Sequence, residues 1–172
     1  MHQASPETPR PVPGPGVLHL LCGKIAAGKS TLATRLADSL LAVLIREDDW
    51  MPRLYPGEIH TLDDYVRCTA RLRAAMAGHV ANLLRAGVTV VLDFPSNTPA
   101  SRAWARTVFE AAGAPHVLHF LDVPDEVCKA RMHARNASGE HPYQVSDAEF
   151  DQFTSRFVAP ADDEGFEIAR YG

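Results

Sequence analysis

The stretch Gly23-Lys24-Ile25-Ala26-Ala27-Gly28-Lys29-Ser30 matches the complete phosphate-loop pattern G-x-x-x-x-G-K-[ST]. An apolar run at 17–22 precedes it and predicts a buried strand. The segment 31–41 follows it and predicts a helix, with three leucines on one face, Leu32, Leu36 and Leu40. A strand, a glycine turn and a helix in this order form the context in which the pattern binds phosphate. The stretch therefore predicts a site for a nucleoside triphosphate.

The two glycines of this loop allow backbone angles that other residues resist, so its N–H groups can point inward at an anion. The start of the following helix adds unpaired amides and the positive end of its dipole. We expect Lys29 to reach the β- and γ-phosphates of ATP and the Ser30 hydroxyl to hold Mg²⁺. The expected nucleotide-binding residues are Gly23, Lys24, Ile25, Ala26, Ala27, Gly28, Lys29, Ser30 and Thr31.

The composition is that of an ordinary globular protein. Of 172 residues, 46% are hydrophobic and 22% are charged, which suits one domain with a substantial core. The net charge of −4 gives no general attraction to nucleic acid, and no apolar run approaches the roughly 18 residues of a membrane span. Three widely spaced cysteines favour buried thiols in a reducing cytoplasm, at Cys22, Cys68 and Cys128.

The segment 1–16 contains five prolines and lacks the apolar centre of a secretory signal. We therefore expect a disordered lead-in over 1–16 and a single domain over 17–172. Within that domain, strands are predicted at 17–22, 42–46, 88–93, 116–123 and 166–171. Helices are predicted at 31–41, 61–85, 100–112, 124–135 and 146–157, and a proline- and glycine-containing loop at 51–60. This alternation predicts an α/β fold, a parallel sheet with helices on both faces and ligands at the carboxyl ends of its strands.

Acidic residues close two of these strands. Asp93 ends a β-branched run, a position from which an acid can orient Mg²⁺. Asp48 and Asp49 end the second strand, where a carboxylate can face the γ-phosphate and accept a proton from an attacking hydroxyl. Either acid is a candidate for this general base, and a turn cap is the alternative role.

Two groups of arginines are candidates for charge neutralisation. Arg131 and Arg135 are four residues apart and share a helical face, so both can close over the triphosphate as part of a lid. The polar segment 136–145 beside them is predicted to be mobile. The second group lies on the predicted helix 61–85 and consists of Arg67, Arg71 and Arg73. These arginines either form a solvated face, or one or two of them face a substrate.

Taken together, these residues resemble the small P-loop kinases of the phage polynucleotide kinase and zeta toxin type, over 17–171. Glu47-Asp48-Asp49-Trp50 is similar to the R-D-D-Y stretch of phage polynucleotide kinase, in which the first Asp is the general base. Val91-Leu92-Asp93, with Asn97 and Arg102-Ala103-Trp104 after it, is similar to the third strand and the helix that follows. Asp122-Val123-Pro124, with Arg131 and Arg135, resembles the lid helix of that family.

The resemblance implies a single P-loop NTPase or kinase domain with a five-stranded sheet of order 2-3-1-4-5 and a helical lid. It implies that Asp48 is the base, that Lys29, Arg131 and Arg135 assist transfer, and that Ser30 and Asp93 hold Mg²⁺. Contacts to the acceptor are expected from Asp48, Asp49, Trp50, Arg53 and Asn97. One departure weakens a polynucleotide acceptor: Met51 occupies the position at which the phage enzyme has an arginine for the 3′-phosphate.

Three functions are consistent with these features. The first is a cytoplasmic, ATP-dependent kinase that phosphorylates a hydroxyl of a small molecule. The second is a polynucleotide 5′-hydroxyl kinase, in which arginines of 53–73 would line a groove. The third is an ATP-binding switch protein with little turnover, although a switch needs no acceptor-side base.

Overall fold

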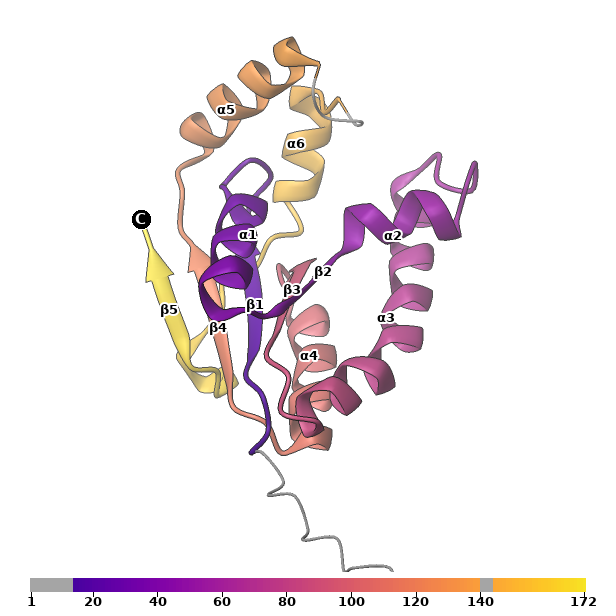
Figure 1. Ribbon diagram of the computed structural model, residues 1–172. Coiled ribbons are helices and arrows are strands. Elements are labelled where there is room, and N and C mark those ends of the chain that lie inside the picture. The colour runs from indigo at the N-terminus through magenta and orange to yellow at the C-terminus, as the bar shows by residue number, and fades with distance from the viewer. Residues whose placement is uncertain (1–13, 140–143) are drawn as a thin grey trace, which may run out of the picture.

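The computed structural model describes residues 14–139 and 144–172. Its centre is a parallel sheet of five strands in the order β2-β3-β1-β4-β5 (Figure 1). The strands are β1 Leu18–Gly23, β2 Val43–Arg46, β3 Val90–Pro95, β4 His116–Leu121 and β5 Ile168–Tyr171. The expected fold class and strand order are confirmed. The proline-rich lead-in expected at 1–16 lies outside the described residues, except for its last three.

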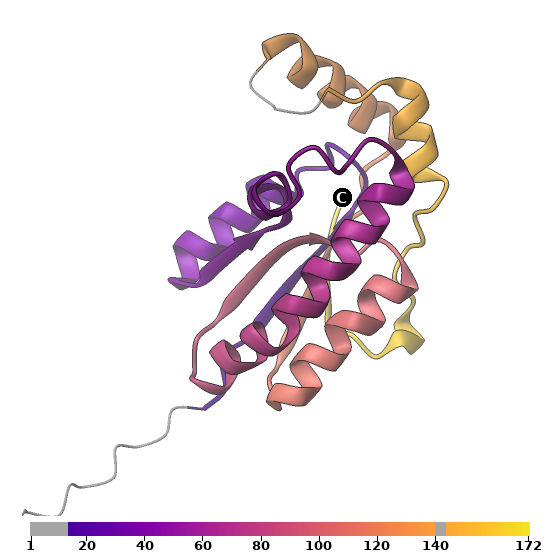
Figure 2. The ribbon, with the colours of Figure 1, turned by 90° about the vertical axis from the view of Figure 1, so that its right-hand side faces the viewer.

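The helices are α1 Lys29–Leu40, α2 Glu47–Leu54, α3 Leu62–Arg85, α4 Pro99–Ala112, α5 Asp125–Ser138 and α6 Asp147–Thr154, with a short 3₁₀ turn, η1, at Asp162–Glu164. Helices α3 and α4 lie side by side on one face of the sheet and α1 lies on the other (Figure 2). Helices α5 and α6 lie beyond the carboxyl ends of the strands (Figure 1). None of the helices in the described part of the chain has the length and apolar composition that a membrane crossing requires.

Strand β1 supplies both hydrophobic cores because its side chains alternate between the two faces of the sheet. Leu18, Leu20 and Cys22 pack in the core beneath α3 and α4, whereas Leu21 packs in the core beneath α1. Every residue of β1 is buried, as a central parallel strand requires. All three cysteines are buried and unpaired, at Cys22, Cys68 and Cys128, as the sequence led us to expect.

Helix α2 is the main departure from the predicted elements. The segment 51–60 was expected to be a loop because of its prolines and glycine, yet α2 continues through Pro52 to Leu54. Acidic residues in its first turn favour helix formation through the dipole, and Met51 is buried in the core at 3% exposure. The burial of Met51 outweighs the hydrogen bond that Pro52 removes from so short a helix.

Helices α3 and α6 begin at the capping residues that the sequence predicted. Each begins with a capping box, formed by Thr61 with Asp64 and by Ser146 with Glu149. Hydrogen bonds from Thr61 and Arg67 lower the pKa of the Asp64 carboxyl to about 2. Helix α3 then runs unbroken for 24 residues past Gly78, because its apolar face supplies a continuous contact with the sheet and with α4.

A chain of polar rings, buried at its two histidines, crosses three neighbouring strands. His19 on β1 and His119 on β4 share a hydrogen bond of 2.9 Å, and the second ring nitrogen of His119 bonds to the hydroxyl of Tyr171 at 2.8 Å. Burial lowers the pKa of His19, and it lowers the pKa of His119 to about 4. Both histidines are therefore satisfied core residues, as expected from their positions in strands.

This chain of rings predicts acid sensitivity. Because the pKa of His119 is lowered by folding, the unfolded chain takes up a proton below pH 6.5 that the folded chain resists until about pH 4. The free energy of unfolding should fall by about 2 kcal/mol over that window, after a discount for solvent near the sheet edge. His119→Gln should flatten this dependence, whereas the exposed His79→Gln should not. Urea unfolding at several pH values from 7 to 4 measures this free energy. An equal dependence on pH in wild type and His119→Gln would contradict the prediction.

Candidate active site

A cavity of about 1360 Å³ opens over the carboxyl ends of the strands. Its walls come from the phosphate loop, the starts of α2 and α4, one face of α3, helix α5 and the end of α6. Parallel α/β sheets place ligand sites at this edge. The cavity is large enough to hold a nucleotide and a second small molecule together.

The phosphate loop has the backbone geometry that its sequence predicts. Gly28 has φ 103° and Ala26 has φ 58°, so the chain turns sharply into α1 and holds strain at a non-glycine residue. A Cβ atom at Gly23 would lie 3.0 Å from the backbone oxygen of Leu121, which makes this a position for glycine. No side chain caps the first amides of α1, so they remain open to an anion.

Lys29 is the partly buried cation at the centre of the loop. Its ammonium donates hydrogen bonds to the backbone oxygens of Gly23 at 2.8 Å and Lys24 at 2.7 Å. Burial lowers the pKa of Lys29, while the charges of Asp93 and Asp48 act in the opposite direction. The ammonium thus holds the loop in shape while it lines the cavity.

Three oxygen-bearing side chains gather beside this lysine: Ser30, Asp48 and Asp93 line the same cavity. Burial raises the pKa of Asp93, against a hydrogen bond from the Ser30 hydroxyl and the charge of Lys29. Asp48 is near enough that its charge also raises the pKa of Asp93. On the next strand, Arg46 lies 3.7 Å from the Asp93 carboxylate. Ser30 and Asp93 are hard oxygen donors that could hold Mg²⁺.

Three residues expected to contact the acceptor lie outside the cavity. Asp49, Trp50 and Arg53 are exposed, and none of them lines it. The guanidinium of Arg53 instead donates a hydrogen bond to the backbone oxygen of Asp49. The reason is that these residues form a helix and not a strand end, so successive side chains point about 100° apart, and Glu47 and Asp48 line the cavity whereas Asp49, Trp50 and Arg53 do not.

Asn97 lines the cavity, but both ends of its side-chain amide bind the phosphate loop. Its Oδ1 accepts from the backbone N–H of Gly23 at 2.9 Å, and its Nδ2 donates to the oxygen of Gly23 at 2.9 Å. The amide therefore ties the loop after β3 to the end of β1. These two bonds make Asn97 a support for the phosphate loop, and the contact with the acceptor that the sequence led us to expect stays a prediction.

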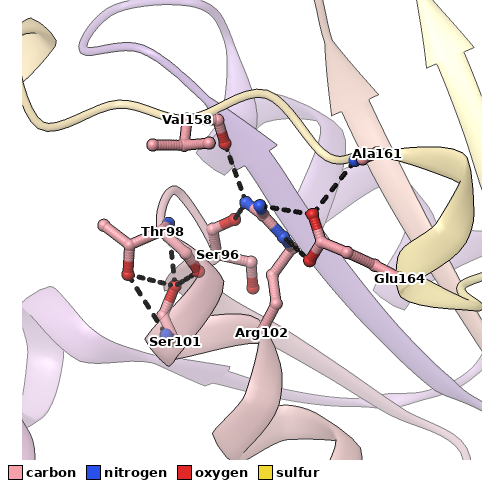
Figure 3. Close-up of polar contacts among 7 residues, drawn as sticks. All are labelled: Ser96, Thr98, Ser101, Arg102, Val158, Ala161 and Glu164. Carbon is pink, nitrogen blue, oxygen red and sulfur yellow. Dashed lines mark hydrogen bonds and ion pairs between the residues drawn. The ribbon is translucent and has the colours of Figure 1, made fainter.

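Arg102 in turn fixes the segment that carries Asn97 (Figure 3). This arginine is completely buried, with its Nε and Nη2 donating to the Glu164 carboxylate at 2.6 and 2.7 Å. Its Nη1 donates to the backbone oxygens of Ser96 at 3.1 Å and Val158 at 2.9 Å. Hydrogen bonds from Arg102 lower the pKa of the Glu164 carboxyl. One guanidinium thus joins the loop after β3, the segment after α6 and η1.

This buried guanidinium predicts a large stability effect. Arg102→Met would leave the Glu164 carboxylate and two backbone oxygens without their donor, which should cost about 3 kcal/mol of unfolding free energy. Arg106→Met, on the same helix, removes an ion pair with the exposed Glu110 and should cost less than about 1 kcal/mol. Chemical denaturation of the three proteins measures the difference. Equal midpoints for the two variants would show that the buried network contributes nothing.

The amide of Asn97 predicts an effect on nucleotide affinity. Asn97→Asp keeps the acceptor for the Gly23 N–H but loses the donor to the Gly23 oxygen and adds a negative charge beside the loop. We expect the affinity for ATP–Mg²⁺ to fall about tenfold. Asn82→Asp adds the same charge at an exposed site on α3 and should leave the affinity unchanged. Calorimetric titration with ATP–Mg²⁺ measures both, and an unaltered affinity in Asn97→Asp would refute the supporting role.

Helix α5 also contacts the phosphate loop. The guanidinium of Arg131 donates to the backbone oxygen of Ala27 at 3.3 Å, and Lys24 forms an ion pair with Asp125 at the start of α5. Arg131 and Arg135 both line the cavity, so the pair predicted to close over the triphosphate does share it. The segment 136–145 was expected to be mobile, but α5 continues to Ser138, and residues 140–143 lie outside the described part.

Several cavity residues were not singled out from the sequence. The cavity is lined by Glu47, Tyr65 and Trp104. It is also lined by Arg73, one of the three arginines that the sequence assigned either to a solvated face or to a substrate contact. The other two are exposed, with Arg67 paired to Asp64 and Arg71 near Glu58 at 3.8 Å. A usable signal existed for Arg73, because it follows Leu62, Val66 and Thr69 at helical spacing and so shares their face.

Comparison with known proteins shows the family to which the chain belongs. Residues 18–160 match the family described as the AAA domain. The adenylyl-sulfate kinase of Myxococcus xanthus (strain DK1622) is 31% identical over 150 residues, which cover 77% of this chain and 78% of that protein.

Two solved structures share the fold. The Mycobacterium tuberculosis APS kinase CysC, in complex with AMPPNP and APS, superimposes with a TM-score of 0.62 at 24% identity, covering 92% of this chain and 89% of that one. Chaetomium thermophilum Kti12, in complex with ADP-AlF3, gives a TM-score of 0.67 at 15% identity over 90% of this chain and 89% of that one. By the family match and the sequence relative, the chain belongs to the AAA domain family, as a small P-loop kinase and an ATP-dependent phosphotransferase.

Proposed function

We propose that this phosphotransferase moves the γ-phosphoryl group of ATP to a hydroxyl of a small molecule. The observation that carries the proposal is the shared cavity, in which the Asp48 carboxylate faces the same space as Lys29 and Ser30. Asp48 also acts on the charge of both Lys29 and Asp93, so the acid and the cradle are electrostatic neighbours. A phosphate cradle beside an acid, with room between them, is the arrangement that transfer to an alcohol needs.

The nucleotide would lie along the phosphate loop, residues 23–31. Lys29 and the open amides of α1 would bind the β- and γ-phosphates, and Arg131 would reach the polyphosphate from α5. Mg²⁺ fits beside Ser30 and Asp93, because it favours one or two protein oxygens with the rest of its shell from phosphate and water. When bound, the ion would neutralise charge on the phosphates.

Asp48 would accept the proton of the acceptor hydroxyl as its oxygen forms a bond to the γ-phosphorus. The bond between that phosphorus and the bridging oxygen of ADP breaks in the same step, so the products are a phosphate ester and ADP. Arg131 and Arg135 would neutralise the charge that spreads over the transferring group. Arg135 is suited to this, since its Nε is buried and has no hydrogen-bond partner among the described residues.

The acceptor is proposed to be a small molecule and not a polynucleotide. A nucleic-acid groove would need the free cations of Arg53, Arg67 and Arg71. Arg53 instead bonds to its own helix, Arg67 pairs with Asp64, and Arg71 lies near Glu58, all of them away from the cavity. The sequence relative is by name a kinase of a small molecule, adenylyl sulfate, which is consistent with this choice. A switch protein would not need an acid on the acceptor side.

The role of Asp48 predicts a selective loss of turnover. Asp48→Asn should lower kcat by about 10²- to 10⁴-fold, because the amide cannot accept the proton, while ATP affinity changes little. Asp49→Asn is the matched control, since this neighbour is exposed outside the cavity and should retain wild-type turnover. Transfer of radiolabelled phosphate from ATP to a panel of hydroxylated metabolites first identifies an acceptor, and steady-state rates follow. Equal rates for Asp48→Asn and wild type would remove the base assignment.

A further inference from the structure

The charges that line the cavity are divided between its two ends. Cations gather at the nucleotide end, on the phosphate loop and α5, as Lys29, Arg131 and Arg135. The opposite wall is one face of α3, which is apolar or neutral except for Arg73: Leu62, Tyr65, Val66, Thr69, Ala70 and Arg73. The only hydroxyl of that wall besides Tyr65 is on Thr69, and it already donates to the backbone oxygen of Val66 at 3.0 Å.

Arg73 does not bring a spare positive charge to this wall. Its Nη2 lies 3.5 Å from Oε2 of Glu47, which is only 2% exposed, and donates to the backbone oxygen of Pro95 at 3.3 Å. Tyr65 donates its hydroxyl to the other carboxylate oxygen of Glu47. The guanidinium also lies 5.8 Å from the centre of the Trp104 ring. The Glu47 carboxylate therefore balances the charge of Arg73, and the Pro95 oxygen and the Trp104 ring help to fix its guanidinium in place.

Polar atoms in this part of the wall are left without partners. Among the described residues, Glu47 Oε2, Arg73 Nε and Trp104 Nε1 are buried and make no hydrogen bond. Thr154 Oγ1, at the end of α6, is also buried and makes no hydrogen bond to the described residues. Such atoms are rare in folded proteins because each costs about 1–3 kcal/mol. These atoms have almost no exposed surface, so a ligand would instead meet the exposed part of Arg73, whose side chain is 19% exposed.

The same wall opposes an acidic ligand. A phosphate, sulfate or carboxylate group is normally met by uncompensated guanidinium or ammonium groups. Here the charge of Arg73 is already matched by Glu47, so the buried part of the wall offers such a group no uncompensated cation. Asp48 and Arg156 also line the cavity, but both are exposed, so water screens their opposite charges. The aromatic rings of Tyr65 and Phe153 meet edge to face on this side, which favours an apolar ring-sized body.

We propose that the α3 end of the cavity is the acceptor subsite and that it selects an uncharged, hydroxyl-bearing molecule with an apolar ring, which Arg73 recognises by donating to a neutral oxygen. This inference rests on the proposed function, because it names the substrate class of that reaction. Arg73 is thus a specificity-determining residue, whereas Asp48 remains the group at the reacting hydroxyl.

Binding tested without turnover separates the two proposals. The probes are pairs of one neutral and one anionic compound: thymidine with thymidine 3′-monophosphate, whose phosphate carries about −1.5 to −2 at pH 7, and phenyl glucoside with phenyl glucuronide, which carries a single carboxylate. Each is titrated calorimetrically into the full chain saturated with ADP–Mg²⁺. At least one neutral probe should bind with a Kd about tenfold or more below that of its anionic partner. An anionic probe that binds as tightly as its partner, or no binding by either neutral probe, overturns the proposal.

Variants of two arginines on α3 test the specific contact. Arg73→Met should weaken the neutral probe about tenfold, and Arg73→Lys should also weaken it although it retains a cation for Glu47. Arg71→Met, at an exposed site on the same helix, should have no effect. Circular dichroism and ADP affinity show whether each variant is folded. If Arg73→Met does not fold, Arg73→Lys is used as the test variant. Full affinity in a folded Arg73 variant contradicts the assignment.

The two proposals fail in different ways. If neutral probes bind through Arg73 but no hydroxyl compound is phosphorylated with ATP–Mg²⁺, the subsite stands and the kinase proposal fails. If radiolabelled phosphate passes instead to an anionic acceptor, the kinase proposal stands and the choice of an uncharged substrate fails.

Discussion

A partly buried ammonium group organises the site. The charge of Lys29 is favoured there because backbone oxygens of Gly23 and Lys24 accept its hydrogen bonds, and because the acids at 48 and 93 lie near it. Those bonds bend the loop around the lysine and leave the first amides of α1 facing outward into the cavity. A cation in an apolar setting would otherwise lose its proton or disrupt the fold. The phosphate-binding geometry follows from the need of the Lys29 ammonium for hydrogen-bond acceptors and nearby negative charge.

Around that loop, the structure uses buried polar side chains as connectors. The amide of Asn97 joins the loop to the segment after β3, and the guanidinium of Arg102 joins that segment to Glu164 and to the chain after α6. Each connector is almost fully paired, which is the condition under which a buried polar group holds a fixed geometry. In contrast, the buried atoms that lack a partner in the described chain all belong to residues that line the cavity. Within the described chain, the unpartnered buried side-chain atoms are therefore confined to residues of the site.

The division of charge explains how one cavity could serve two different molecules. The nucleotide end concentrates cations around open helix amides, which suits a polyphosphate. The α3 end balances Arg73 against Glu47 and lines the rest with apolar side chains. Asp48, at the start of α2, stands where the two ends meet. Such an arrangement would place a neutral alcohol beside a triphosphate without attracting a second anion.

Local sequence patterns were enough to predict the parallel sheet, the phosphate loop with Lys29 and Ser30, the acid at the end of β3 and the capped starts of α3 and α6. These features depend on neighbours within a few positions, because strand alternation, glycine turns and capping boxes are local. Which side chains reach the cavity depends instead on how the folded chain packs. Pro52 predicted a loop, yet burial of Met51 completes a helix that places Asp48 in the cavity wall and leaves Asp49, Trp50 and Arg53 outside. Arg102 finds its partner 62 residues away, and Arg73 meets Glu47 from another helix. Contacts between such distant positions arise from packing, which no local pattern encodes.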